Sequence, residues 1–210
     1  MGGSREPGGS LQEEPANRTI QRWGYSVFKR GLLRSQIRKA WDECIAVDYA
    51  RQRINSERSL QASLWAKMND LLDERTRRMF IEPRLSCENG SDSTYRYPDL
   101  VVCNTQSVIG IIELKYRPKG KPAWKKDVET MEWVAANRKK LSVQNKRYKG
   151  LEVDSRIYRL SPYVLFVWAG IHAKAEVKVS EHISKRLQGC FLELHAVTSR
   201  NRQPKVWWKG

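Results

Sequence analysis

Two short segments of this chain combine strand-forming and charged residues: Tyr97-Pro98-Asp99-Leu100-Val101-Val102 and Ile111-Ile112-Glu113-Leu114-Lys115-Tyr116. Each is rich in Val, Ile or Leu, which is typical of a buried strand. A buried ion without a partner is costly, so Asp99, Glu113 and Lys115 are expected to meet at one site. Two carboxylates can hold a hard divalent cation, and a neighbouring ammonium can orient water. Together they suffice for phosphodiester hydrolysis.

The composition favours one basic domain with an anionic partner. The 210 residues are enough for one well-buried core. The net charge of +16 makes nucleic acid the first candidate partner. The four cysteines lack zinc-ligand spacing, and no apolar stretch approaches the length of a membrane span. We therefore expect a cytoplasmic protein with reduced thiols and no membrane partner.

The composition also divides the chain into four parts. Residues 1–18 are rich in Gly, Pro, Ser and charge, which predicts a disordered tail. Residues 19–53 form a basic extension that becomes an amphipathic helix from about residue 33. Residues 54–200 form the core, and residues 201–210 form a basic arm. The basic face of the extension is either solvated or in contact with phosphates.

Within the core, the pattern predicts alternating helices and strands. A helix begins at Glu57 after an Asn55-Ser56 cap and ends near Glu74. Strands over 79–86, 95–103 and 108–116 are expected to form an antiparallel meander. The remaining predicted elements are a long helix from Pro122 or Ala123 toward Tyr148, a central strand over 162–168, a shorter helix over 177–187 and a strand over 191–197.

The alternation of side chains along a strand predicts how Asp99, Glu113 and Lys115 can come together. Alternation sorts the third strand into two faces, with Ile109, Ile111, Glu113 and Lys115 on one, and Val108, Ile112 and Leu114 on the other. Asp99 shares the first face only if it lies opposite a residue of that face, and Glu113 is the partner we consider. That register pairs Asn104 with Val108 and leaves the three-residue loop 105–107. An odd loop or a β-bulge is therefore required.

Pro98-Asp99 followed by Glu113-Leu114-Lys115, after a helix that begins at Glu57, resembles the PD-(D/E)xK nuclease superfamily. The resemblance covers about residues 54–170, including the helix and the apolar strand that follow the motif. It implies a restriction-endonuclease-like α/β core. In this fold a central mixed sheet of four to five strands is flanked by helices in the order αβββαβ, here with an N-terminal helical extension.

The resemblance also implies the roles of the site residues. Asp99, Glu113 and the main-chain carbonyl of Leu114 would bind Mg²⁺, for which Mn²⁺ could substitute. Glu57 would complete the metal site through a water molecule. Lys115 would orient the attacking water or help to deprotonate it. Further polar residues that could face the site are Gln61, Lys125, Lys126 and Asp127.

Simpler interpretations stay open for several of these residues. An acidic residue in a first helical turn, such as Glu57, complements the helix dipole. Lys115 could merely neutralise a carboxylate in an ion pair. We leave His172 out of the site, because a lone loop histidine is more often a surface or hydrogen-bonding residue. In the C-terminal arm, Trp207 and Trp208 could stack on unpaired bases or pack on the core.

Basic residues cluster directly after the motif. Residues 115–149 contain twelve Lys and Arg against three Asp and Glu, a net charge of +9. A solvated helix face would explain part of this run, but its position beside the motif favours contact with a phosphate backbone. The nucleic-acid-binding candidates are Arg117, Lys119, Lys121, Lys125 and Lys126.

The expected function is that of a metal-dependent DNA endonuclease, with DNA preferred over RNA as the substrate. The alternative is a non-catalytic protein on a nuclease-like fold that binds DNA or RNA. Three buried charges argue against it, since a dead site has no reason to keep them. No module that reads base sequence is evident, so a partner chain could supply specificity. A homodimer would provide the two sites that double-strand cleavage needs.

Overall fold

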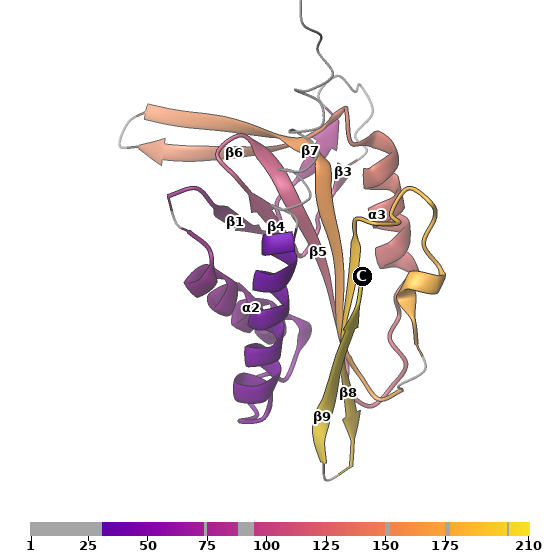
Figure 1. Cartoon of the computed structure of the whole chain (residues 1–210). Coiled ribbons are helices and arrows are strands. Elements are labelled where there is room, and N and C mark those ends of the chain that lie inside the picture. The colour runs from indigo at the N-terminus through magenta and orange to yellow at the C-terminus, as the bar shows by residue number, and fades with distance from the viewer. Residues whose placement is uncertain (1–30, 74, 88–94, 150–151, 175–176, 201) are drawn as a thin grey trace, which may run out of the picture.

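The computed structural model describes residues 31–73, 75–87, 95–149, 152–174, 177–200 and 202–210. These residues form a mixed α/β fold, in which helices cover both faces of one curled, mixed sheet (Figure 1). The mixed α/β class predicted from the sequence is therefore confirmed. The predicted tail (1–18) and the start of the basic extension (19–30) lie outside the described residues.

Two helical segments precede the sheet and pack on one of its faces. Residues 31–43 are α-helical and continue into a π-helix, η1 (Cys44–Tyr49). The next helix is α2 (Glu57–Leu71), and the Oγ of its Ser56 cap accepts a hydrogen bond from the Ser59 N–H at 3.2 Å. Both predicted helices are confirmed, and each ends a few residues earlier than expected. In the described ranges, no helix combines the length and apolar character needed to cross a lipid bilayer.

Four strands with the spatial order β1, β4, β5, β7 make the centre of the sheet. Their bounds are Arg78–Ile81, Leu100–Cys103, Ser107–Arg117 and Glu152–His172. β1, β4 and β5 pair antiparallel, which confirms the predicted meander. α3 (Lys125–Asn137) then packs on the face opposite α2, and β7 lies parallel to β5 (Figure 1). β7 contributes to the cores on both faces, as predicted for a central strand.

The other strands extend the sheet in two directions. β8 (Phe191–Ser199) pairs parallel with the second half of β7, and β9 (Arg202–Lys209) pairs antiparallel with β8. β6 (Leu141–Lys149) pairs with the first half of β7. On its other side β6 pairs with β2 (Leu85–Cys87), and β2 pairs with β3 (Tyr95–Arg96). The C-terminal arm is thus a strand of the sheet.

Two of the predicted strands are each divided in the structure. The predicted strand over 79–86 becomes β1 and β2, which pair with different partners. The chain turns between them at Glu82, whose φ of 45° lies in the left-handed region. The predicted strand over 95–103 becomes β3 and β4, because residues 97–99 leave the ladder at Pro98, which has no N–H to donate.

Two helical predictions are wrong in extent. The long helix ends at Asn137, and residues 141–149 form β6, since Leu141 and Val143 are buried at alternate positions beside β2 and β7. The helix expected over 177–187 is only a 3₁₀ turn, η2 (Val179–Glu181). There the carboxylates of Glu193 and Glu132 accept hydrogen bonds from the backbone N–H groups and the hydroxyls of two serines, Ser180 and Ser184. These bonds compete with a helix.

Candidate active site

The register of β4 against β5 brings Asp99 to the face that carries Glu113. Leu100 lies opposite Ile112, and the same register continues to the pair of Val102 and Gly110. Extended by one residue, it sets Asp99 opposite Glu113, as the parity argument predicted. The register then shifts between Val102 and Cys103, so the required irregularity is a β-bulge.

The bulge lies closer to the motif than the expected three-residue loop. Cys103 pairs with Val108, so the predicted pairing of Asn104 with Val108 is wrong. Asn104 closes a tight turn instead, and its backbone N–H donates to the Ser107 carbonyl at 2.9 Å. The extra residue also exchanges the sheet faces on which Val108 and Ile109 lie. Val108 packs on the α3 side with Ile111, and Ile109 packs on the α2 side, the reverse of the prediction.

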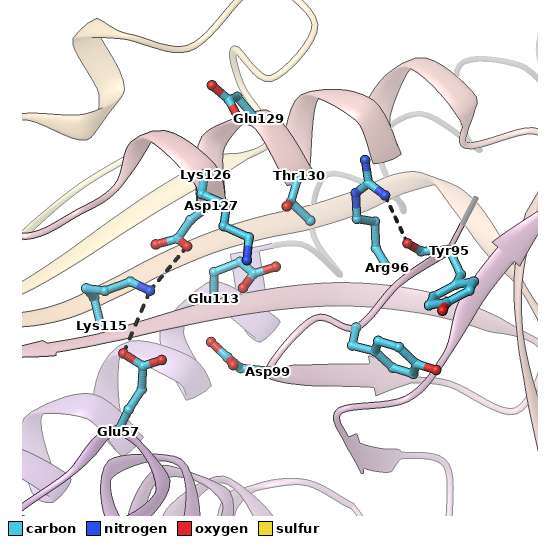
Figure 2. Close-up of a pocket in the computed structure, with 11 residues that line it drawn as sticks. Glu57, Tyr95, Arg96, Asp99, Glu113, Lys115, Lys126, Asp127, Glu129 and Thr130 are labelled. Atoms are coloured by element: carbon cyan, nitrogen blue, oxygen red, sulfur yellow. Dashed lines mark hydrogen bonds and ion pairs between the residues drawn. The ribbon is translucent and has the colours of Figure 1, made fainter. Parts of the chain in front are cut away.

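All four predicted catalytic residues line one cavity of about 570 Å³ (Figure 2). Glu57 comes from α2, Asp99 precedes β4, and Glu113 and Lys115 come from β5. The remaining lining residues are Tyr95, Arg96, Tyr97, Lys126, Asp127, Glu129 and Thr130. The structure therefore brings together side chains that are far apart in the sequence.

The backbone around Asp99 is held firmly in place. Its carbonyl accepts hydrogen bonds from the Gln61 Nε2 at 2.8 Å and from the Glu82 N–H at 3.0 Å. Its Oδ2 accepts the Leu114 N–H at 2.5 Å. Because the N–H and C=O of one strand residue point to the same edge, the Leu114 carbonyl also faces the edge where Asp99 lies. Gln61 thus positions the Asp99 peptide group.

The ammonium of Lys115 lies between two carboxylates. Its Nζ is 3.3 Å from the Asp127 Oδ1 and 3.7 Å from the Glu57 Oε2, as Figure 2 shows. Both carboxylates have a second partner: Glu57 accepts the Tyr116 N–H at 3.2 Å, and Asp127 accepts the Trp168 Nε1–H at 3.1 Å. Lys115 is therefore fixed in position by two anchored anions.

The structure distinguishes the three candidates at the start of α3. Asp127 is only 6 % exposed and contacts Lys115. Lys126 also lines the cavity, whereas Lys125 is not among the lining residues. The sequence held a signal for Asp127, because it shares the helical spacing of Met131 and Val134, which are buried. A charged residue on such a stripe needs a partner inside the protein.

Glu113 is the residue whose charge is most strongly opposed. It is 7 % exposed, and its Oε1 is buried without a hydrogen-bond partner among the described residues. Burial, followed by the charges of Asp99 and Asp127, raises its pKa well above the ordinary value of 4.5. Burial also raises the pKa of Asp99 to about 6, although the Leu114 N–H opposes this shift. For Lys115, burial alone would lower the pKa, but Asp127 and Glu57 raise it overall.

These residues fit a hard divalent cation. Asp99, Glu113 and the Leu114 carbonyl are oxygen donors of the type that Mg²⁺ prefers, with water in its remaining positions. Burial and neighbouring carboxylates both oppose the negative charges of Asp99 and Glu113, and a cation beside them would offset that cost. Among the described residues, no three Asp, Glu, His or Cys side chains are grouped as ligands of one ion. The candidate set is therefore two carboxylates, one carbonyl and water.

The basic candidates follow the end of β5. Arg117, Lys119, Lys121, Lys125 and Lys126 are all exposed, and of these only Lys126 lines the cavity. Arg117 ends β5, and Lys125 and Lys126 begin α3. The loop between them, which carries Lys119 and Lys121, is attached to the sheet, because the Thr198 Oγ1 donates to the Pro118 carbonyl at 2.6 Å and the Ala173 N–H donates to the Gly120 carbonyl at 3.1 Å. The loop thus presents its positive charge from a fixed place near the cavity.

Two histidines form a separate buried cluster. His172 is fully buried, and its Nε2 lies 2.8 Å from the Nδ1 of His195. His172 is therefore a hydrogen-bonding residue inside the protein, and it does not line the cavity. The His195 ring stacks on Trp207 with centroids 3.7 Å apart, which supports the packing role of the C-terminal arm.

No family model, no curated protein and no solved structure matches this chain. The site consists of the half-buried carboxylate of Asp99 and the buried carboxylate of Glu113, beside a lysine that two further carboxylates hold, on one face of a mixed sheet in a strongly basic protein.

The raised carboxyl pKa values predict how stability depends on pH. The folded state holds the protons of Asp99 and Glu113 more tightly than the unfolded chain, which releases them near pH 3.8 and 4.5. The stability from these groups is fully present below pH 3.8 and is lost as pH rises through about 6 for Asp99, and beyond that for Glu113. In EDTA, we expect the free energy of unfolding to fall by roughly 2 kcal/mol across this window from Asp99 alone.

Urea unfolding at a series of pH values measures this slope. The Asp99→Asn variant is the control, because it removes one of the titrating groups and should flatten the curve. Equal slopes in the two proteins would show that Asp99 titrates normally in the folded state.

Proposed function

We propose that this chain is a metal-dependent nuclease with a restriction-endonuclease-like fold, which hydrolyses phosphodiester bonds in DNA. The observation that carries the proposal is the convergence of Asp99, Glu113 and Lys115 in one cavity, with the Glu113 Oε1 buried and unpartnered among the described residues. A purely structural ion cluster would pair its buried oxygens.

The order of the elements supports the finer fold assignment. α2, β1, β4, β5, α3 and β7 follow one another as helix, three antiparallel strands, helix and parallel strand. The short strands β2 and β3 and the nine-residue strand β6 lie between them in the sequence. This is the αβββαβ order that the resemblance implies. The two motif segments end up on β4 and β5, the neighbouring strands that the nuclease site requires.

The residues have separable roles in the proposed reaction. Asp99, Glu113 and the Leu114 carbonyl would hold Mg²⁺, which when bound lowers the pKa of its water and neutralises charge on the phosphate. Glu57 lies across the cavity and could contact the ion through water. The raised pKa of Lys115 keeps it protonated near neutral pH, so it is suited to orient the attacking water by donating a hydrogen bond.

The basic residues would position the substrate. Exposed lysines and arginines bind phosphates without reading sequence, and their attraction extends beyond contact. Lys126 lines the cavity itself, and Arg117, Lys119 and Lys121 follow directly from the strand that carries Glu113. A DNA backbone drawn to this loop would lie beside the carboxylates.

Incubation of the protein with supercoiled plasmid and Mg²⁺ tests the proposal. We expect cleavage that EDTA stops and that Lys115→Ala slows by roughly 10² to 10⁴-fold, the range of a lost general acid–base group. Lys185→Ala is the matched control, because Lys185 is exposed and does not line the cavity.

The outcome separates the nuclease from a non-catalytic binding protein. The binding protein is favoured by the two ion pairs of Lys115, which would suffice for a structural cluster. Absence of cleavage on any nucleic acid, or equal cleavage by wild type and Lys115→Ala, would support the binding protein and refute the nuclease.

A further inference from the structure

Two exposed tyrosines stand at the cavity that holds the carboxylates. Tyr95 is 41 % exposed and Tyr97 is 54 % exposed. Their rings meet edge to face, with centroids 5.3 Å apart and an interplanar angle of 68°. Both line the same cavity as Asp99 and Glu113. Large aromatic rings left open to water beside a polar site are unusual, and they mark a surface for recognition.

The protein holds the Tyr95 ring in place and leaves both rings partly open to water. Tyr95 and its neighbour Arg96 form β3, which pairs with β2. The guanidinium of Arg84 lies 4.7 Å from the centroid of the Tyr95 ring, and that of Arg96 lies 4.8 Å from the centroid of Trp133. Figure 2 shows Tyr95 and Arg96 at one end of the cavity, with the carboxylates at the other. The Tyr95 ring is therefore held between Arg84 and Tyr97, at the end of the cavity where Arg96 also lies.

We propose that Tyr95 and Tyr97 form a stacking platform for unpaired bases, so that the DNA substrate is single-stranded or splayed next to the scissile phosphate. This inference rests on the proposed nuclease function and names its substrate class. Rings of this kind bind any base, because every base has a π-face. In an intact duplex those faces are covered by the neighbouring base pairs, and only base edges are open in the grooves.

The spacing along the chain suits such a substrate. Tyr97 precedes Asp99 by two residues, which is at most about 7 Å of backbone. A base stacked on Tyr97 would thus be only a short distance from a phosphate at the carboxylates. Lys126 and Arg96 line the same cavity and could contact the phosphates on either side.

The C-terminal tryptophans fit this role less well. The Trp207 ring is stacked on His195, and the guanidinium of Arg38 lies 3.2 Å from the centroid of the Trp208 ring. Neither residue lines the cavity. Trp208 is about as exposed as Tyr95, so its position outside the cavity is what separates it from the two tyrosines.

Fluorescence anisotropy of labelled DNA tests the platform. The full chain is titrated, with Ca²⁺ in place of Mg²⁺, against a single strand, the matching blunt duplex, a duplex with a single-stranded flap, and a single strand in which the bases are replaced by abasic sites. We expect wild type to bind the single strand and the flap more tightly than the duplex. The abasic strand should bind weakly, because it has the charge but no bases.

Tyr97→Ala should lower affinity for the single strand and the flap by roughly tenfold or more, the range seen for loss of one stacked base, and leave duplex affinity unchanged. Tyr97→Phe keeps the ring and should bind as wild type does. Trp208→Ala is the matched control for an exposed aromatic residue outside the cavity. An unchanged melting temperature would show that Tyr97→Ala folds normally.

Different results would contradict the stacking platform and the nuclease function. Equal binding of abasic and normal single strands, or an equal loss on duplex and single strand in Tyr97→Ala, would overturn the platform even if the protein cleaves DNA. A base-dependent preference that Tyr97→Ala abolishes would support the platform even if wild type cleaves no DNA. In that case the nuclease proposal alone would be wrong.

Discussion

Replacing Glu113 with glutamine is expected to abolish Mg²⁺-dependent cleavage and, at the same time, to stabilise the metal-free protein. Cleavage should fall by at least about 10⁴-fold, because the amide cannot supply the negative charge that holds the ion. The free energy of unfolding at pH 8 should rise by on the order of 1 kcal/mol, because a neutral side chain avoids the cost of a buried carboxylate whose Oε1 has no hydrogen-bond partner in the described part of the chain. If Glu113 served only stability, Glu113→Gln would instead lower the free energy of unfolding and leave cleavage unchanged.

Plasmid cleavage and urea unfolding in EDTA measure the two quantities on the same preparation. Glu181→Gln is the matched control, since Glu181 is exposed and its ion pair with Lys178 contributes little. It should change neither quantity. Thermal melting with and without Mn²⁺ adds a direct test of metal binding, since a bound ion stabilises the folded state by mass action. A Glu113→Gln protein that is less stable and still cleaves would make Glu113 structural.

Replacing Trp168 with alanine is expected to cause a large loss of stability, about 3–5 kcal/mol. Trp168 is fully buried in β7, and its Nε1–H donates to the Asp127 Oδ2. Its ring also occupies the space above Gly170, where a Cβ would lie 2.3 Å from the Trp168 Cη2. The substitution therefore opens a cavity and removes the partner of Asp127, which in turn anchors Lys115.

A double-mutant cycle in urea separates these effects. Gly170→Ala alone should be strongly destabilising, because the new methyl group meets the indole ring. In the Trp168→Ala background the same change should cost much less, since the ring is gone. Trp168→Phe should be milder than Trp168→Ala and should still weaken the Asp127 anchor. Additive losses in the cycle would show that the indole ring does not limit the space at Gly170.

Much of the site followed from local sequence pattern. Alternation along one strand is enough to place Glu113 and Lys115 on the same face, and the cap at Ser56 is enough to start α2 at Glu57. The register that sets Asp99 opposite Glu113 followed from the same reasoning. The bulge that it required could have stood anywhere in the hairpin, and its position inverted the faces of Val108 and Ile109.

The two errors in the extent of the helices have different causes. Residues 141–149 are a strand because residues 152–159 pair with them, and neither segment has a decisive pattern alone. Ser180 and Ser184 leave the expected helix because Glu193 and Glu132 accept their hydrogen bonds. These partners of the serines are 13 and 52 residues away, so no local window of sequence contains them.

The amino-acid sequence was thus sufficient for what depends on neighbouring residues: the charged strands, the helix that begins at Glu57 and the order of the central elements. Tertiary structure alone showed that Asp127 joins Glu57 in holding Lys115, that Glu113 keeps one oxygen unpartnered among the described residues, and that Tyr95 and Tyr97 line the same cavity. The reason is physical. Periodicity and capping act over one or two turns of chain, whereas burial and charge pairing depend on sheet register and helix packing between segments far apart in the sequence.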